Sequence, residues 1–263
     1  DNASAEDVAA VVRGRPGLEL VRLKRNAGSC AKAFGVARAR GDMLLFLDDD
    51  SYPRVGCVER MLQRFAEDPA LGAAGFLVHL PDGSQECSAL PHVFVGCGLG
   101  LRASALRAVG GLDVSFFMAA EEYDLSFRLL QAGWKVEIFN DLHVEHLKTP
   151  QARRAEQTTY HDVANNCRVA ARYLPPPYYR IYRREWLTRY RWLADAQGHR
   201  RAWQRGCRMG WLRALVERPR FRRWRLTSPV LEQVFGWSYV AARMADLRAR
   251  GARRVVLADY GKN

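Results

Sequence analysis

The hydrophobic and polar positions in the first half of the chain form two kinds of segment. Short runs such as MLLFL at residues 43–47 are apolar on both faces, which is typical of strands buried inside a sheet. Longer segments such as residues 55–68 place apolar side chains three or four positions apart, which predicts amphipathic helices. Their alternation favours an α/β domain with a mostly parallel sheet. Further strands are expected at residues 18–23, 73–80, 93–100 and 136–139, and further helices at residues 5–13, 30–40, 103–109 and 121–132.

Three aspartates, Asp48, Asp49 and Asp50, directly follow the apolar run at residues 43–47. In open α/β sheets ligands bind beyond the carboxyl ends of such strands, and side chains two apart in extended backbone point the same way. The carboxylates of Asp48 and Asp50 would repel each other unless a cation lay between them. Mg²⁺ or Mn²⁺ shared with substrate phosphates suits such a site. A solvated acidic turn that caps the next helix is the alternative, and this motif alone leaves it open.

A second acidic group, Glu121, Glu122 and Asp124, stands at the start of a predicted helix. The helix dipole favours carboxylates there by roughly 0.3–1 kcal/mol each and keeps them ionised, as a general base requires. The ordinary charge bias of helix N-termini explains the same triplet without a catalytic role. His146 follows the last predicted strand, downstream of this acidic segment, and is a candidate ligand for the same metal ion.

Charge divides the chain into two regions. The 263 residues carry a net charge of +13, but residues 1–150 hold 16 basic and 20 acidic residues (−4) and residues 151–263 hold 25 basic and 8 acidic residues (+17). Six of the seven tryptophans also lie in the second region. We therefore expect an acidic α/β domain over residues 1–150 and a basic, Arg/Trp-rich α-helical region over residues 151–263.

In the second region, Trp203, Cys207, Trp211 and Leu215 recur at helical spacing, with arginines on the remaining faces. A helix of this kind suits a membrane interface, where anionic head groups add roughly 1 kcal/mol for each well-placed cation. A helical bundle with a solvated arginine surface is the alternative. Nucleic-acid binding is the least favoured interpretation, because no recognisable nucleic-acid module accompanies the arginines.

Composition excludes several classes of protein. A hydrophobic content of 48% excludes a disordered chain. The apolar runs fall short of the ~18 residues that span a bilayer, so no transmembrane helix is predicted. The six cysteines are scattered without a C-x-x-C pair, which indicates free thiols in a reducing, cytoplasmic compartment and no zinc site.

Five motifs follow one another along the first region: Asn26-Ala27-Gly28, LDDD at residues 47–50, GLRASALRAVGGLD at residues 100–113, EEYDLSFRLLQAGW at residues 121–134, and His146. Each is weak alone, but in this order and spacing they resemble the family 2 glycosyltransferases, in particular bacterial rhamnosyl- and galactosyl-type transferases. The resemblance covers residues 1 to about 150. It implies the GT-A fold, with helices on both faces of its sheet. It also implies inverting, metal-dependent transfer of a hexosyl or deoxyhexosyl group from a nucleotide-diphospho-sugar.

The resemblance implies a role for each matching residue. Asp50 and His146 would hold Mg²⁺ or Mn²⁺, and Glu122 would deprotonate the acceptor hydroxyl, with Glu121 as the alternative base. The relatives usually have Glu-Asp where this chain has Glu121-Glu122. Substrate-binding roles fall on Asp1 at the nucleotide base, Lys32 near the nucleotide, Asp48 near the ribose, the adjacent Asp49, and Asp124 as a residue that orients the site.

The resemblance also implies partners and a location. Relatives often act on lipid-linked saccharides in cell-envelope or polysaccharide biosynthesis, which fits a peripheral place on an anionic inner membrane face. Relatives begin with a strand and a helix before the position of Asp1, so we expect this chain to lack that first unit. The alternatives are an inactive transferase-like scaffold that binds membrane or nucleic acid, and a nucleotidyltransferase. The latter lacks its Gly-rich, basic nucleotide loop here.

Overall fold

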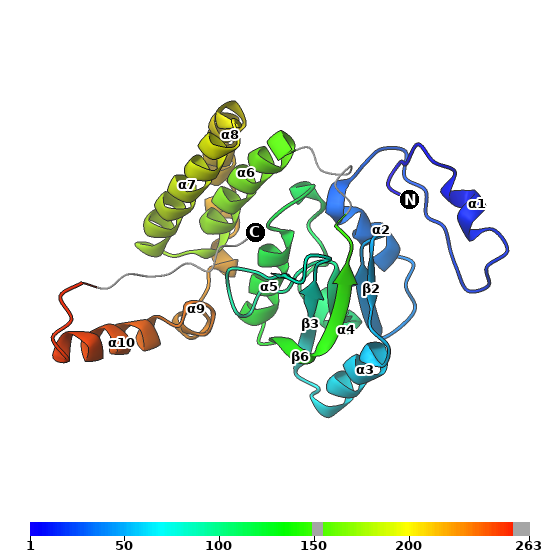
Figure 1. Ribbon diagram of the computed structural model, residues 1–263, viewed down its shortest axis with the longest axis horizontal. Helices are drawn as coiled ribbons and strands as arrows, with labels where there is room; N and C mark the ends of the chain where they lie inside the picture. Colours follow the sequence, from blue (N-terminus) through cyan, green and yellow to red (C-terminus); the bar gives the residue numbers. More distant parts are fainter. Residues whose placement is uncertain (149–154, 255–263) are drawn as a thin grey trace.

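The computed structural model describes residues 1–148 and 155–254, as an α/β part followed by C-terminal helices (Figure 1). Its strands are β1 (Met43–Leu47), β2 (Ser51–Pro53), β3 (Leu71–His79), β4 (Gln85–Glu86), β5 (Gly98–Arg102) and β6 (Lys135–His146). The helices of the α/β part are α1 (Val8–Val12), α2 (Lys32–Val36), α3 (Cys57–Glu67), α4 (Ala103–Ala108) and α5 (Glu121–Gln131), with 3-10 turns η1 (Gly28–Ala31) and η2 (Val114–Phe116). The later helices are α6 (Ala155–Tyr173), α7 (Tyr178–Ala196), α8 (Arg200–Arg220), α9 (Ser228–Phe235) and α10 (Trp237–Ala249), with η4 (Arg222–Trp224) before α9.

The strands form one sheet in the order β1-β5-β3-β6-β2, with β4 paired to β3. Among the strand pairs of the described residues, β3 and β6 run parallel and the other four pairs run antiparallel. The expected α/β sheet is confirmed, but the expectation that it is mostly parallel is wrong. Apolar periodicity reports how deeply a strand is buried, whereas direction depends on which strands become neighbours. Strands β1 and β5, separated in sequence by β2, α3, β3 and β4, pair directly.

Helices cover both faces of this sheet, as the GT-A resemblance implies. Leu99 and Leu101 of β5 belong to the core shared with α4, α5 and α6. The intervening Gly100 faces α3, where an added methyl group would lie 2.5 Å from Met61 Sδ. The missing side chain therefore lets α3 lie close against the strand. The last residues of β1 and β6 and the first residue of β5 lie at one edge of the sheet.

Three predicted strands differ from those of the structure, and the one expected at residues 93–100 is β5, Gly98–Arg102. Residues 18–23 are not a regular strand, although the Asp1 ammonium group donates to Val21 O (2.9 Å) and Leu23 N–H donates to Asp1 O (2.9 Å). Strand β6 extends well beyond the predicted residues 136–139 and ends at His146. Leu142 and Val144 are buried and alternate with polar neighbours, which is the pattern of a half-exposed strand.

The helices α6, α7 and α8 pack side by side (Figure 1). Small buried residues of α8 meet α6: a methyl group added to Gly206 would lie 2.8 Å from Val163 Cβ, and one added to Gly210 would lie 2.6 Å from Cys167 Cβ. The two helices therefore approach closely, as the bundle alternative requires. The expected boundary between the regions, near residue 150, lies outside the described residues.

The predicted face of Trp203, Cys207, Trp211 and Leu215 is not one exposed stripe. Trp203 is half-buried and its Nε1–H donates to Leu187 O of α7 (3.1 Å), whereas Trp211 and Leu215 are 51% and 57% exposed. Each four-residue step turns about 40° around an α-helix, so the series passes from the α7 interface to the surface. None of the described helices is both long and apolar enough to cross a membrane.

Candidate active site

The acidic residues after β1 lie at the edge of the sheet where β1 and β6 end and β5 begins. Leu47 is paired with Gly98 at the start of β5, and Ser51 is paired with His146 at the end of β6. The Asp48 N–H donates to Ser51 Oγ (2.8 Å), and that hydroxyl donates to Cys97 O (3.1 Å). Strands that are far apart in the sequence thus bring polar side chains to one place.

His146 is buried at this edge, with 3% of its side chain exposed. Its Nε2 lies 3.3 Å from Asp50 Oδ1, and its Nδ1 lies 3.0 Å from Glu86 Oε2 of β4. The Cys97 sulfur lies 3.5 Å from the same Nδ1. The two ring nitrogens therefore face two different acidic groups, an arrangement that fixes the orientation of the imidazole ring.

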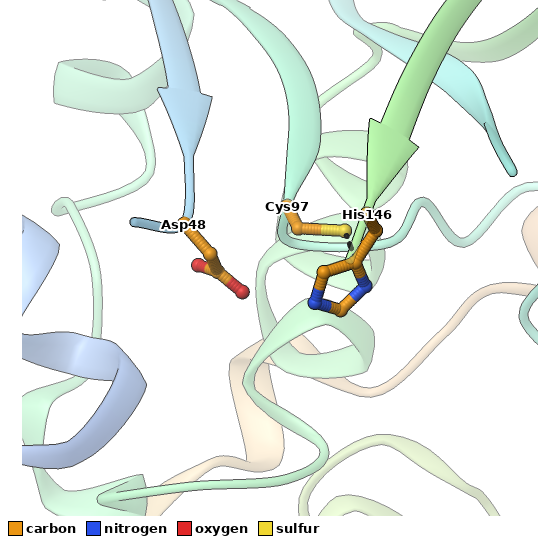
Figure 2. Close-up of side chains that lie close together, drawn as sticks. All are labelled: Asp48, Cys97 and His146. Carbon is orange, nitrogen blue, oxygen red and sulfur yellow. Dashed lines mark hydrogen bonds between the residues drawn. The ribbon is translucent and has the colours of Figure 1, made fainter. Parts of the chain in front are cut away.

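Ligand atoms of Asp48, Cys97 and His146 lie within 4.8 Å of one another, as Figure 2 shows. Asp50 adds a carboxylate oxygen beside His146. Carboxylate oxygens and an imidazole nitrogen are donors that Mn²⁺ accepts, and carboxylates also suit Mg²⁺. The donor set at this edge therefore fits the divalent cation expected from the sequence. Burial and the nearby Asp48 carboxylate raise the pKa of the Cys97 thiol to about 12.

Lys32 connects this cluster to the second acidic group. Its Nζ donates to Asp48 Oδ1 (2.5 Å) and to Gly96 O (2.8 Å). The Glu122 carboxylate lies against the same glycine, since a methyl group added to Gly96 would be 3.3 Å from Glu122 Oε1. A small cavity is lined by Lys32, Gly96, Glu121 and Glu122 together. Lys32 therefore joins Asp48, after β1, to this hollow, which the glutamates at the start of α5 line.

Glu121 is partly buried beside the turn that carries Ser29. Ser29 Oγ donates to its Oε1, and its buried Oε2 has no hydrogen-bond partner among the described residues. Burial and the adjacent Glu122 carboxylate raise the pKa of Glu121 to about 8. The side chain is therefore mostly protonated at neutral pH. The two adjacent carboxyl groups therefore keep a proton at neutral pH that two separate glutamates would lose.

The loop before α5 holds these glutamates in a conformation that L-residues rarely adopt. Phe117, Ala119 and Ala120 have φ angles of 62°, 65° and 67°, and left-handed non-glycine residues cost on the order of 1–3 kcal/mol each. Asn165 of α6 holds the loop, because its Nδ2 donates to the carbonyls of Phe116 (2.9 Å), Met118 (2.7 Å) and Ala119 (3.1 Å). A buried amide outside the α/β part thus fixes the start of α5.

Asp124 does not face the hollow. Its side chain is 1% exposed, its Oδ2 accepts from Arg128 (3.0 and 2.7 Å), and its Oδ1 accepts from Arg172 (2.7 Å) and Tyr173 (2.5 Å). With both oxygens occupied by buried donors, Asp124 has no free position for a substrate. The carboxylate joins α5 to α6, and its expected role of orienting the site stays a prediction.

Asp1 and Asp49 lie outside these contacts. The Asp1 carboxylate accepts from Ser4 N–H (2.8 Å) and pairs with Arg22 (3.2 Å). Its neighbour Asn2 accepts from Ala27 N–H (2.7 Å), so the N-terminal segment lies beside the turn that carries Ser29. Asp49 is exposed. The structure brings together Lys32, Asp48, Asp50, Glu121, Glu122 and His146.

Sequence reasoning missed three residues of this site: Ser29, Glu86 and Cys97. Glu86 lies in a two-residue strand that no periodicity could reveal. Ser29 follows Asn26-Ala27-Gly28, so its nearness to a conspicuous motif was the available signal. Cys97 lies between two glycines directly before β5, and its distance from any other cysteine hid its proximity to His146.

Comparison with solved structures identifies the fold. The fold is that of the GT-A glycosyltransferases. Solved structures with this fold include S. aureus TarS 1-349 in complex with UDP (TM-score 0.54, 13% identity, 98% of this chain and 83% of that one). Another is the mannosyltransferase PcManGT from Pyrobaculum calidifontis with GDP-Man and Mn²⁺ (TM-score 0.52, 14% identity, 94% and 70%). A third is GalNAc-T7 with UDP, GalNAc and Mn²⁺ (TM-score 0.54, 14% identity, 71% and 44%).

Sequence comparison defines the family. The model of glycosyl transferase family 2 matches residues 1–110, and that of glycosyl transferase family group 2 matches residues 76–252. The chain belongs to the family 2 glycosyltransferases. A curated relative, the pre-mycofactocin glycosyltransferase of Mycobacterium tuberculosis, is 30% identical over an alignment covering 40% of this chain. That alignment spans only 27% of the relative's length.

The buried state of Glu121 predicts how stability depends on pH. Its pKa is about 8 in the folded protein against 4.5 ordinarily, so the folded chain keeps a proton that the unfolded chain loses between these values. The free energy of unfolding should therefore fall as the pH rises through this window. Glu121→Gln removes the titrating group, should flatten this decline, and should make the variant more stable than the wild type above about pH 8.

Urea unfolding between about pH 5 and about pH 9 measures this dependence. Glu59→Gln, at an exposed glutamate of α3, is the matched control and should keep the wild-type slope. Parallel pH profiles for the wild type and Glu121→Gln would show that Glu121 is ionised throughout.

Proposed function

We propose that this chain carries the catalytic site of an inverting glycosyltransferase that uses a nucleotide-diphospho-sugar and a divalent cation. The observation that supports this most strongly is the single hollow bounded by Lys32, Gly96 and Glu122, beside the metal-ligand cluster of Asp50 and His146. Inverting transfer requires a base on the acceptor side and charge neutralisation on the leaving side. The two acidic groups, about 70 residues apart in sequence, supply one requirement each.

On the donor side, Asp50 and His146 would hold Mg²⁺ or Mn²⁺, and Asp48 would contact the ribose. The cation, when bound, neutralises charge that develops on the leaving diphosphate. Lys32 lies between Asp48 and Gly96 and places a second positive charge at the same edge. Asp1 and Asp49 complete the proposed donor contacts, Asp1 on the side of the nucleotide base. Solved structures of similar proteins contain UDP or GDP-Man, with Mn²⁺ in two of them.

On the acceptor side, Glu122 would act as the general base. Its carboxylate would take the proton as the acceptor hydroxyl oxygen forms a bond to the anomeric carbon. The bond from that carbon to the diphosphate oxygen breaks on the opposite face, so the configuration inverts. Glu121 is the poorer candidate, because burial favours its protonated form. Protonated Glu121 also lowers the repulsion that a second carboxylate would exert on Glu122.

The acceptor that suits this chain is a saccharide or a lipid-linked saccharide, with a hexosyl or deoxyhexosyl group as the part transferred. In this proposal residues 1–150 form the catalytic domain. Residues 151–263 support the loop before α5 on the acceptor side, for example through Asn165. They also contact the membrane that holds a lipid-linked acceptor.

Replacing the proposed base separates catalysis from binding. Glu122→Gln should lower the transfer rate by about 10²–10⁴, the usual contribution of a general base, while nucleotide affinity stays unchanged. Release of nucleoside diphosphate from a panel of nucleotide sugars measures the rate. Calorimetry with UDP or GDP and Mn²⁺ measures the affinity.

Two variants frame that result. Asp50→Asn should weaken the metal-dependent nucleotide binding that Glu122→Gln leaves intact, and the exposed Glu59→Gln should change neither. A wild-type transfer rate in Glu122→Gln would show that Glu122 is not the general base. Nucleotide binding with the same affinity in the presence and absence of the metal would contradict the proposed donor site.

The membrane part of the proposal rests on an open groove of about 580 Å³ at the end of α8. Tyr179, Trp211 and Leu215 provide apolar walls, and the remaining lining includes Arg218, Arg222 and Arg225. Arg218 lies over the Tyr179 ring at 4.2 Å and donates to Ala171 O of α6 and to Leu174 O directly after it. The nearest acidic residue along the helix, Glu217, instead binds Arg168 and Arg172. Positive charge beside exposed apolar side chains suits anionic lipid head groups.

Vesicle flotation tests this surface. The wild type should float with vesicles that contain phosphatidylglycerol. It should remain at the bottom of the gradient when the vesicles contain phosphatidylcholine alone. The double variant Arg218→Glu/Arg222→Glu should lose most of that binding, whereas Arg13→Glu/Arg15→Glu, with the same net charge and exposed positions, should keep it. Equal loss in both variants would point to bulk charge alone, and equal retention would exclude this groove.

A further inference from the structure

The position of Cys97 goes beyond what the proposed transfer requires. Its side chain is 1% exposed and stands directly before β5, between Asp48 and His146 (Figure 2). The sulfur lies 3.5 Å from His146 Nδ1, and the ligand atoms of all three residues lie within 4.8 Å of one another. A carboxylate oxygen, a sulfur and a nitrogen thus converge on one small volume.

This donor set differs in kind from one made of oxygen alone. Carboxylates and water suit Mg²⁺, whereas a thiolate favours Zn²⁺ and similar soft or borderline ions. Reactive zinc sites usually have three protein ligands and a further position for substrate or water, and zinc accepts Cys, His and Asp as ligands. The absence of a C-x-x-C pair predicts no zinc site. That prediction overlooks a site of this kind, because such pairs do not reveal ligands that come from separate strands.

The surroundings of His146 agree with a metal at Nε2. Figure 2 shows one ring nitrogen turned toward Asp48; the Cys97 sulfur lies nearest the other, Nδ1, and the ligand atoms of the three residues stay within 4.8 Å of one another. Glu86 lies 3.0 Å from Nδ1 and can accept its proton in a hydrogen bond. That interaction leaves the Nε2 lone pair available on the side of Asp48 and Asp50, as a carboxylate–histidine–metal arrangement requires.

We propose that Cys97 is a metal ligand and that this site binds thiophilic divalent cations such as Zn²⁺ and Co²⁺ much more tightly than Mg²⁺. The inference rests on the proposed metal site but not on sugar transfer. As the bond from sulfur to metal forms, the thiol proton leaves to solvent, so the metal replaces one proton and no oxidant or reductant takes part. One consequence is that Zn²⁺ competes with Mg²⁺ or Mn²⁺ for the donor side of the hollow.

Cobalt spectroscopy tests this directly on the full chain after removal of metal. Titration of the wild type with Co²⁺ should produce a near-ultraviolet band from thiolate-to-cobalt charge transfer, saturating near one ion per chain. Cys97→Ser keeps the size of the side chain and should abolish the band. Cys87→Ser, at an exposed cysteine, should retain it in full.

Calorimetry supplies a second readout that does not depend on colour. Zn²⁺ affinity should fall at least about tenfold in Cys97→Ser, while Mg²⁺ affinity should change by less than about twofold. Circular dichroism checks that the variant is folded. A wild type without the charge-transfer band, or a Cys97→Ser variant that retains it, would overturn the inference. A cobalt band in a protein without transferase activity would leave the inference standing and remove the proposed function instead.

Discussion

A buried carboxylate that contacts no substrate fixes where the two glutamates of the hollow lie. Asp124 connects α5 to α6: it accepts hydrogen bonds from Arg128 of α5 and from Arg172 and Tyr173 of α6. Removing one partner from such a group leaves an uncompensated charge, which costs about 3–5 kcal/mol. The strained turn just before α5 adds to this dependence, because Asn165 of the same α6 holds its carbonyls. Helix α6 is therefore part of what shapes the hollow.

The same junction changes how the charge of residues 151–263 is understood. Arg168 and Arg172 have 1% and 3% of their side chains exposed and share Glu217 of α8 between them. Their cationic groups also stack on the Phe116 ring, next to the loop before α5. Part of the basic excess thus lies inside the protein and joins the helical region to the α/β part. The arginines around the groove at the end of α8 form a separate, outward set.

Much of the fold and part of the hollow could be predicted from the sequence, for identifiable reasons. The five apolar residues before Asp48 predicted a strand with the acids at its end, although β1 is the outermost strand of the sheet and fully buries only Leu44 and Phe46. Gly133 after the apolar stripe defined α5, and with it the position of Glu121 and Glu122 at its start. In each case one local pattern specifies both the element and its polar end.

The remainder depends on tertiary contacts that local patterns do not encode. Asp124 shares a helix turn with Glu121, but the arginine that turns it away from the hollow lies nearly 50 residues on. Glu86 and Cys97 reach His146 only because β4 and β5 both pair with β3. The antiparallel sheet was missed for the same reason, since periodicity does not state which strands become neighbours.

Anomalous diffraction from crystals grown with Mn²⁺ and a nucleoside diphosphate tests the shared hollow most directly. The manganese peak should lie within bonding distance of Asp50 and His146, with the diphosphate on the side of the ion that faces Glu122. A manganese ion bound elsewhere, or a diphosphate separated from Glu122 by the sheet, would contradict the arrangement on which the proposed transfer depends.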